Sequence, residues 1–169
     1  MPGESTVRER RQCKGGGIMV WLMTFPNGLL AYRIIRNKFK AVDYISMLQD
    51  KLVPCMRLNY GNNFFFQEDN CAVHKAKIVK DFMAANHVNV LEWPAKSPDL
   101  NIVEDVWKLI SDIVYNRPSF QKMTDLEKAI VDAITYVQIK KMDTILDLYK
   151  GIRKRLCTVL YKQGNFFNK

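Results

Sequence analysis

The chain has 169 residues, 48% of them hydrophobic, which suits one compact domain with a core and is too short for two domains of ordinary size. Its 26 lysines and arginines outnumber its 17 aspartates and glutamates, and the net charge of +9 favours a polyanionic partner such as nucleic acid. No stretch approaches the roughly 18 consecutive apolar residues of a membrane span, and no secretory signal precedes the domain, so we expect a soluble intracellular protein.

The amino-terminal part predicts a tail followed by a β-hairpin. Residues 1–14 are polar and charged and predict a loose tail, so that one domain covers residues 15–169. Two apolar runs, over residues 18–23 and 29–35, flank a Pro-Asn-Gly sequence at 26–28. Apolar runs on either side of Asn-Gly are typical of a hairpin.

The middle of the chain predicts alternating helices and strands. Apolar residues at helical spacing predict a helix from Val42 to about Leu58, despite Pro54 near its end. An aromatic strand over residues 63–69 follows, and then a helical stretch and a second strand over residues 88–93.

Three helices are predicted in the carboxyl-terminal part. The first begins at about Asn101, and the second opens with Thr124 and Glu127 at the spacing of a capping box. The last has apolar residues that we expect to face inward: Ile145, Leu148, Ile152, Leu156 and Val159.

Two acidic residues stand where strands and helices can bring them together. Asp69 ends a strand and Glu104 lies in the first turn of a helix, and phosphodiester chemistry with two divalent metals needs carboxylates that converge from separate segments. Structural alternatives fit the same pattern: Asp69 can form a turn or helix cap, and Asn101 with Glu104 a capping pair. Asp105 and Asp99 are rival ligands, but Asp105 points about 100° away from Glu104 around the helix.

Further polar residues near Asp69 have two interpretations each. His74 can orient a ligand carboxylate or a phosphate, or it can be a cap or surface group. Cys71 and His74 have a zinc-like spacing, but no second pair follows, and we expect no zinc site.

The four cysteines predict free thiols. Basic residues can contact phosphates or form solvated helix faces; they are Lys75, Lys77, Lys80, Lys96, Arg153, Lys154 and Arg155.

The residues around both acids resemble a known family. The segment 66–70, Phe-Gln-Glu-Asp-Asn, with His74 after it, resembles the signature around the second catalytic aspartate of mariner-superfamily (Tc/mariner-like) transposases. The segment 97–101, Ser-Pro-Asp-Leu-Asn, followed by Glu104, is similar to the one that bears that family's third catalytic acid, and the 34 residues between Asp69 and Glu104 are the typical separation. The likeness extends over roughly residues 14–116.

The resemblance implies an α/β fold: an RNase H-like mixed sheet flanked by helices, with extra carboxyl-terminal helices. The family's first catalytic aspartate lies on a strand upstream of the glycine-rich residues 15–17, so this chain is expected to lack that strand. The strand would be central, between the hairpin and the Phe64 strand, and its loss is expected to expose two sheet edges. Ile102, Asp105 and Cys71 differ from the residues that the family usually has at these positions, but both acids are retained.

The resemblance also implies a function. We expect a fragment or remnant of a cut-and-paste DNA transposase catalytic domain, acting in the nucleus on DNA, with a homodimer or a full-length transposase as a further partner and no small-molecule substrate. Asp69 and Glu104 would be the catalytic ligands of Mg²⁺ or Mn²⁺, Asn70 and His74 would support them, and cleavage by the chain alone would be severely reduced. The alternatives are a domesticated, non-catalytic DNA- or protein-binding module and a nonfunctional relic.

Overall fold

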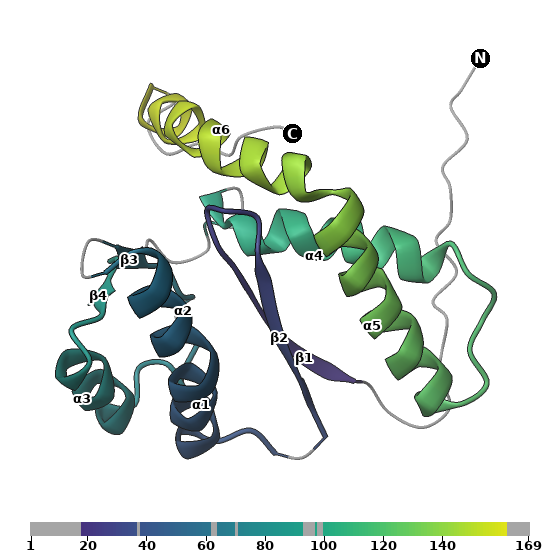
Figure 1. Ribbon diagram of the computed structural model, residues 1–169, viewed down its shortest axis with the longest axis horizontal. Coiled ribbons are helices and arrows are strands. Elements are labelled where there is room, and N and C mark those ends of the chain that lie inside the picture. The colour runs from purple at the N-terminus through teal and green to yellow at the C-terminus, as the bar shows by residue number, and fades with distance from the viewer. Residues whose placement is uncertain are drawn as a thin grey trace.

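A β-hairpin lies between two groups of helices (Figure 1). The computed structural model describes residues 18–36, 38–61, 64–69, 71–92, 97 and 100–161. The predicted tail therefore lies outside the described residues. In the described part, no helix is long and apolar enough to cross a membrane.

The predicted hairpin is confirmed. β1 (Met19–Thr24) pairs antiparallel with β2 (Leu30–Ile35). Its turn is closed by hydrogen bonds from the Phe25 N–H to the Leu29 carbonyl at 2.9 Å and from the Gly28 N–H to the Phe25 carbonyl at 2.9 Å. Gly28 has a φ of +83°, which glycine adopts at little cost because it has no Cβ.

The Gly28 turn is held against the carboxyl-terminal helices. The Gln138 side chain donates to the Gly28 carbonyl at 3.3 Å and accepts from the Leu30 N–H at 2.6 Å. A Cβ on residue 28 would come within 2.6 Å of the Met142 Cγ. This turn therefore has no room for a larger residue unless Met142 moves.

The left-handed backbone alone costs a residue with a Cβ about 1–2 kcal/mol. Gly28→Ala is expected to lower the free energy of unfolding by more than this amount, because its Cβ would also contact Met142. Gly61→Ala is the matched control, because Gly61 has a φ of +60° and open space where its Cβ would lie. Urea unfolding followed by circular dichroism measures both variants. Equal losses would show that the Met142 contact has no effect on stability.

The predicted helix over residues 42–58 is confirmed, with an irregular middle. It consists of α1 (Ala41–Met47), a π-helical turn η1 (Leu48–Leu52) and α2 (Val53–Asn59). Pro54 has no N–H and its ring crowds the carbonyl four residues earlier, so it disfavours regular α-helix there. The wider turn just before it accommodates that carbonyl without ending the helix.

The two strands of the middle region are shorter than the sequence predicts. β3 (Phe65–Phe66) pairs in parallel with β4 (Asn89–Val90), and α3 (Lys77–Ala85) connects them. The predicted spans of 63–69 and 88–93 were wrong in length. A strand extends only as far as its partners, and each of these strands has a described partner on one side only.

The three predicted carboxyl-terminal helices are confirmed as α4 (Ile102–Tyr115), α5 (Met123–Lys140) and α6 (Met142–Tyr161). The capping box was wrong, because α5 begins one residue before Thr124 and its N-cap is Lys122. In α6, Ile145 is fully buried but Leu156 is 39% exposed, so its inward placement was also wrong. Leu156 borders an open cavity and does not pack in the core, and the Val159 side chain lies outside the described residues.

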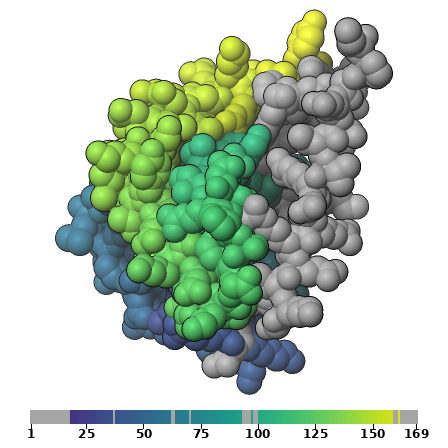
Figure 2. Space-filling model, turned by 90° about the vertical axis from the view of Figure 1, so that its right-hand side faces the viewer, coloured from purple at the N-terminus to yellow at the C-terminus, as the bar shows by residue number. Residues whose placement is uncertain are grey.

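Two hydrophobic cores lie on opposite faces of the hairpin. Trp21 and Met23 pack with the core that α1, α2 and α3 form, whereas Val20 and Leu22 pack with the core of α4, α5 and α6. Alternate residues of a strand point to opposite faces, so β1 contributes to both cores. Helices α4, α5 and α6 make up much of the face shown in Figure 2.

Candidate functional site

Asp69 lies three residues beyond β3, on the segment that leaves the sheet. Its side chain is 64% exposed, and Oδ1 accepts a hydrogen bond from the Cys71 backbone N–H at 3.0 Å. The turn at Asp69, which the sequence analysis gives as an alternative to a metal ligand, is therefore present. The carboxylate still has free lone pairs facing solvent, so this turn does not prevent it from binding a ligand.

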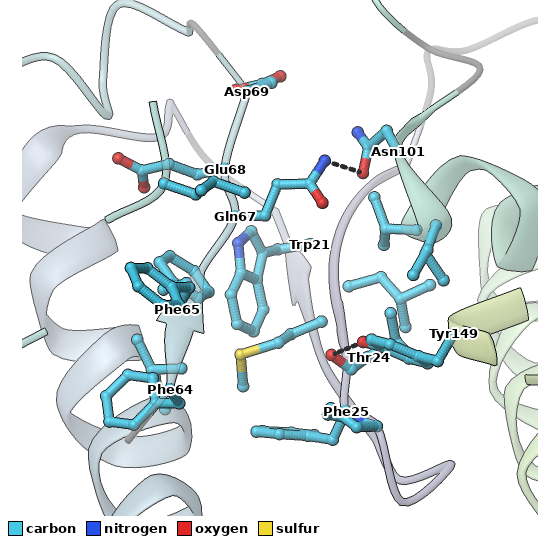
Figure 3. A pocket seen from close by; sticks show the side chains of 18 of the residues that line it. Trp21, Thr24, Phe25, Phe64, Phe65, Gln67, Glu68, Asp69, Asn101 and Tyr149 are labelled. Carbon is cyan, nitrogen blue, oxygen red and sulfur yellow. Dashed lines mark hydrogen bonds between the residues drawn. The ribbon is translucent and has the colours of Figure 1, made fainter. Parts of the chain in front are cut away.

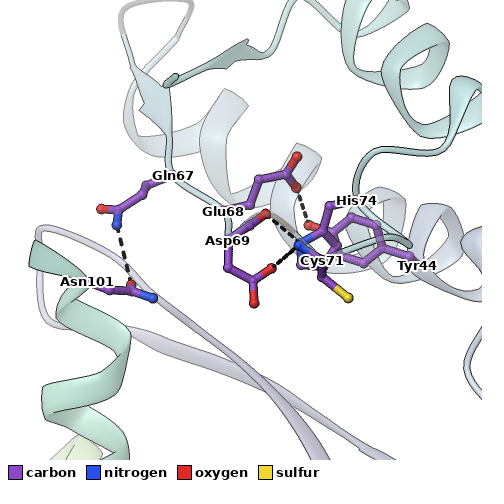
Figure 4. A network of polar contacts seen from close by, with 7 residues as sticks. All are labelled: Tyr44, Gln67, Glu68, Asp69, Cys71, His74 and Asn101. Carbon is purple, nitrogen blue, oxygen red and sulfur yellow. Dashed lines mark hydrogen bonds and ion pairs between the residues drawn. The ribbon is translucent and has the colours of Figure 1, made fainter. Parts of the chain in front are cut away.

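His74 contacts Asp69 directly (Figure 4). Its Nδ1 lies 2.7 Å from Asp69 Oδ1 and 3.2 Å from the Asp69 carbonyl oxygen. Both of these atoms are acceptors, so Nδ1 carries the hydrogen. His74 belongs to a turn before α3 and is not a helix cap, and its side chain is only 15% exposed. It is placed to orient the Asp69 carboxylate.

Tyr44 contacts both His74 and the neighbouring Glu68. Its ring stacks on the His74 ring with centroids 4.4 Å apart, and its hydroxyl donates to Glu68 Oε2 at 2.7 Å. Burial, followed by the charge of Glu68, raises the pKa of Tyr44 well above its ordinary value, so the hydroxyl remains a donor. Burial also raises the pKa of the Glu68 carboxyl, although the hydrogen bond from Tyr44 acts in the opposite direction.

Glu104 lies in the first turn of α4, and its side chain is exposed. Asn101 is the N-cap residue, but its side chain makes no capping hydrogen bond. Instead, Asn101 Oδ1 accepts from Gln67 Nε2 at 3.4 Å, as Figure 4 shows. The alternative of a capping pair was thus wrong, because the Asn101 side chain accepts a hydrogen bond from Gln67 on another segment. This contact joins the segment that carries Asp69 to the start of the helix that carries Glu104.

The rival acids take other roles or lie outside the described residues. Asp105 Oδ2 pairs with Arg155 Nη1 at 2.5 Å, and the two side chains are only 12% and 16% exposed. Asp105 therefore helps to hold α6 against α4, and Arg155 is not an open phosphate contact. Asp99 falls among the residues that are not described.

The other predicted site residues that the structure describes lie on two separate elements, around the start of α3 and on α6. Lys75 is exposed, and Lys77 is 87% exposed and pairs with Asp81 at 2.7 Å. Arg153 and Lys154 are exposed on α6. Asn70 and Lys96 lie outside the described residues.

The donor atoms suit part of a magnesium site. Asp69 and Glu104 both offer exposed carboxylate oxygens, which Mg²⁺ prefers, and Mg²⁺ commonly takes only one or two carboxylates besides water and phosphate. Within the described ranges, no group of three or more histidine, cysteine, aspartate or glutamate side chains is arranged to hold a metal ion. The described residues therefore fit part of a metal-ligand set.

A cavity of about 630 Å³ opens beside these residues (Figure 3). It lies between β1 and the segment 64–69, and Gln67, Glu68 and Asp69 stand at one end of it. Tyr149 donates to the Thr24 carbonyl at 2.7 Å along its wall, and burial raises the pKa of Tyr149 to about 12.

Sequence reasoning missed Tyr44, Gln67 and Glu68 as parts of this site. Tyr44 lies within the helix predicted over residues 42–58 and had no predicted role in the site. A buried tyrosine needs a partner for its hydroxyl, and that requirement was the one available signal for a nearby acid.

The comparisons with known proteins concern the family and the fold of the chain. Residues 1–127 match the family model described as "DDE superfamily endonuclease". The chain is 29% identical over 166 residues to the Tc3 transposase of Caenorhabditis elegans, covering 98% of this chain and 50% of that protein. It is 30% identical over 156 residues to the Tcb2 transposase of Caenorhabditis briggsae, covering 89% and 54%. The chain thus spans about half the length of these relatives.

Solved structures of the Mos1 mariner transposase have a similar fold. Its catalytic domain with raltegravir and Mg superposes with a TM-score of 0.75 at 17% identity, covering 89% of this chain and 77% of that one. Its paired-end complex with Mn gives a TM-score of 0.75 at 20% identity, covering 99% and 49%. These likenesses confirm the predicted α/β, RNase H-like fold class.

Proposed function

Because this chain belongs to the DDE superfamily endonuclease family, we propose that it is part of a DNA transposase catalytic domain that acts on DNA with a divalent metal ion. One observation carries the proposal: the Gln67–Asn101 hydrogen bond joins the two segments, both inside the family match, that bear Asp69 and Glu104. The similarity to Tc3 and Tcb2 supports a transposase over a domesticated binding module.

In this proposal Asp69 and Glu104 hold Mg²⁺ or Mn²⁺. The bound ion would activate a water or a 3′ hydroxyl and stabilise the charge that develops at phosphorus. His74 orients the Asp69 carboxylate through its Nδ1–H. Asn70, which lies outside the described residues, is proposed to support the same acid. Since the described residues supply an incomplete ligand set, cleavage by this chain alone is expected to be weak.

DNA is the proposed partner, in the nucleus. The net charge of +9 favours a polyanion, and Lys75, Lys77 and Lys96 are proposed to contact phosphates near the carboxylates. A homodimer or a full-length transposase is a further proposed partner.

The experiment that tests this function separates metal chemistry from DNA binding. Asp69→Asn and Glu104→Gln are each expected to weaken Mn²⁺ binding by at least about 10- to 100-fold, the loss that follows removal even of an outer-shell partner. Residual Mn²⁺-dependent nicking of supercoiled plasmid should fall with it. Affinity for DNA in EDTA should be unchanged or slightly higher, because each change removes a negative charge.

Asp81→Asn is the matched control, because Asp81 is an exposed carboxylate, 60% accessible, on the neighbouring helix α3. It should leave Mn²⁺ binding and nicking at the level of the unchanged protein. Nicking that survives both site substitutions, or robust strand transfer by this chain alone, would contradict the proposed roles of Asp69 and Glu104.

A further inference from the structure

The carboxyl-terminal half of α6 carries an unbalanced positive charge. Residues 148–161 contain four basic side chains and no acidic one, whereas the first part of the helix has Asp143 and Asp147. Lys150, Arg153 and Lys154 are exposed, and their spacing of three and four residues puts them on one side of the helix. These three side chains are called the α6 basic face below.

Two members of the α6 basic face have no acidic partner. Lys150 pairs with Asp147 at 3.0 Å. Among the described residues, no carboxylate forms an ion pair with Arg153 or Lys154. Like charges three or four residues apart destabilise a helix, although the helix dipole offsets part of this effect near the carboxyl end. A bound polyanion would remove the remaining repulsion, so the α6 basic face suits such a ligand.

The α6 basic face lies beside the start of α4. Arg155, the next residue along α6, pairs with Asp105 at 2.5 Å, and both side chains are largely buried. Asp105 directly follows Glu104 in the chain, so this pair holds residues 153–155 close to the turn of α4 that carries Glu104. Figure 1 shows the same end of α6 on the side of the molecule where α4 begins and β3 lies.

α6 also runs along the cavity toward Asp69. Tyr149 donates to the Thr24 carbonyl at the end of the cavity that lies away from Asp69 (Figure 3). Ile152 and Leu156, further along the helix, line the same cavity. Each residue of a helix advances the chain by about 1.5 Å. The last two members of the α6 basic face therefore lie nearer to the candidate metal ligands than Tyr149 does.

We propose that the α6 basic face binds the phosphates of duplex DNA whose backbone reaches Asp69 and Glu104. The proposal rests on the proposed function, but the family match does not supply it, because that match ends at residue 127 and α6 begins at Met142. Each strand of duplex DNA carries a phosphate about every 3.4 Å. A phosphodiester held at Glu104 therefore has neighbours within reach of long basic side chains on the adjoining helix.

A double variant of the full chain, Arg153→Gln with Lys154→Gln, tests the proposal. Both positions are exposed, and glutamine is a good helix former. Binding to duplex DNA is measured in EDTA between about 50 and 200 mM salt. Each lost phosphate contact lowers the slope of log affinity against log salt by about 0.9, so the slope should fall by about 1.8 and the affinity roughly tenfold or more at about 0.1 M salt. Two duplexes of unrelated sequence should lose affinity equally, because phosphate contacts read no bases.

The matched control is Lys140→Gln with Lys141→Gln, which removes the same charge from exposed residues at the end of α5. Lys141 lies about 18 Å from Arg153 along α6. This distance exceeds the Debye length of about 10 Å at 0.1 M salt, so the affinity should change by less than about twofold. The salt slope should stay the same.

Cys157 provides a second measurement, on the unchanged chain. It is an exposed free thiol four residues after Arg153, on the same side of α6. Saturating DNA should slow its alkylation severalfold, because a bound duplex covers the thiol. Cys55 on α2 is the internal reference, and its alkylation rate should not change. Mass spectrometry of the digested chain measures both rates.

Three results would each overturn the α6 basic face as a DNA-binding surface. They are equal losses in the two double variants, an unchanged salt slope, and alkylation of Cys157 at the same rate with and without DNA. The loss of Mn²⁺ binding expected for Asp69→Asn and Glu104→Gln would be unaffected by them, so the proposed function would stand. Failure of the unchanged chain to bind either duplex would overturn both proposals.

Discussion

Tyr44→Ala is expected to lower the free energy of unfolding by about 3–5 kcal/mol, as removal of a buried aromatic ring does. Tyr44 is 1% exposed, packs edge-on against Phe39 with ring centroids 6.1 Å apart, and lies beneath His74. Its loss would leave a void in the core and would release the His74 ring. Urea unfolding measures the first effect, and NMR of the His74 ring, one of only two histidines, measures the second.

Two further variants separate packing from hydrogen bonding at this position. Tyr44→Phe keeps the ring and removes only the hydrogen bond to Glu68, so it should cost about 1 kcal/mol and leave the His74 signals almost unchanged. Tyr115→Ala removes a ring that is 64% exposed on α4, and should change stability by no more than about 0.5 kcal/mol. If Tyr44→Ala costs no more than Tyr115→Ala, the packing role of Tyr44 is wrong.

Asp105→Ala is expected to cost about 3 kcal/mol, because it removes the carboxylate from a largely buried ion pair with Arg155. The pair connects α4 to α6, so the loss should be largest for the carboxyl-terminal helices. Amide exchange along α6 would report it directly, with urea unfolding as the global measure.

A double variant and an exposed pair are the controls for Asp105. Asp105→Ala combined with Arg155→Met removes both charges and should be more stable than Asp105→Ala alone. Asp81→Ala breaks an exposed pair, in which Lys77 is 87% accessible, and should cost at most about 1 kcal/mol. Equal effects of Asp105→Ala and Asp81→Ala would mean that the α4–α6 pair does not stabilise the fold.

The hairpin and the longer helices could be predicted because their signals are local. Asn27-Gly28 specifies a turn between two apolar runs, and α4 has apolar residues at helical spacing along its whole length. The short strands β3 and β4 could not be bounded in this way. Their length depends on which backbone groups find partners across the sheet, and that depends on segments distant in the sequence.

The candidate site was predictable where a motif carried it. The residues around Asp69 and Glu104 resemble the mariner-superfamily signatures, and the matches to Tc-type transposases confirm that resemblance. Their roles as metal ligands stay a prediction. The supporting contacts were not predictable, because Tyr44 meets Glu68 across 24 residues, and Arg155 meets Asp105 across 50. Such pairs arise from tertiary packing, which no local spacing encodes.

The position of β1 between two cores also determines how its pairing with β2 is specified. A slip of one residue in the hairpin would turn Trp21 and Met23 toward the α4–α6 core and Val20 and Leu22 toward the α1–α3 core. In a sheet with one solvent-exposed face, such a slip exposes one set of apolar side chains to water. Here it would misfit two close-packed interiors at once, so the correct register is selected from both sides.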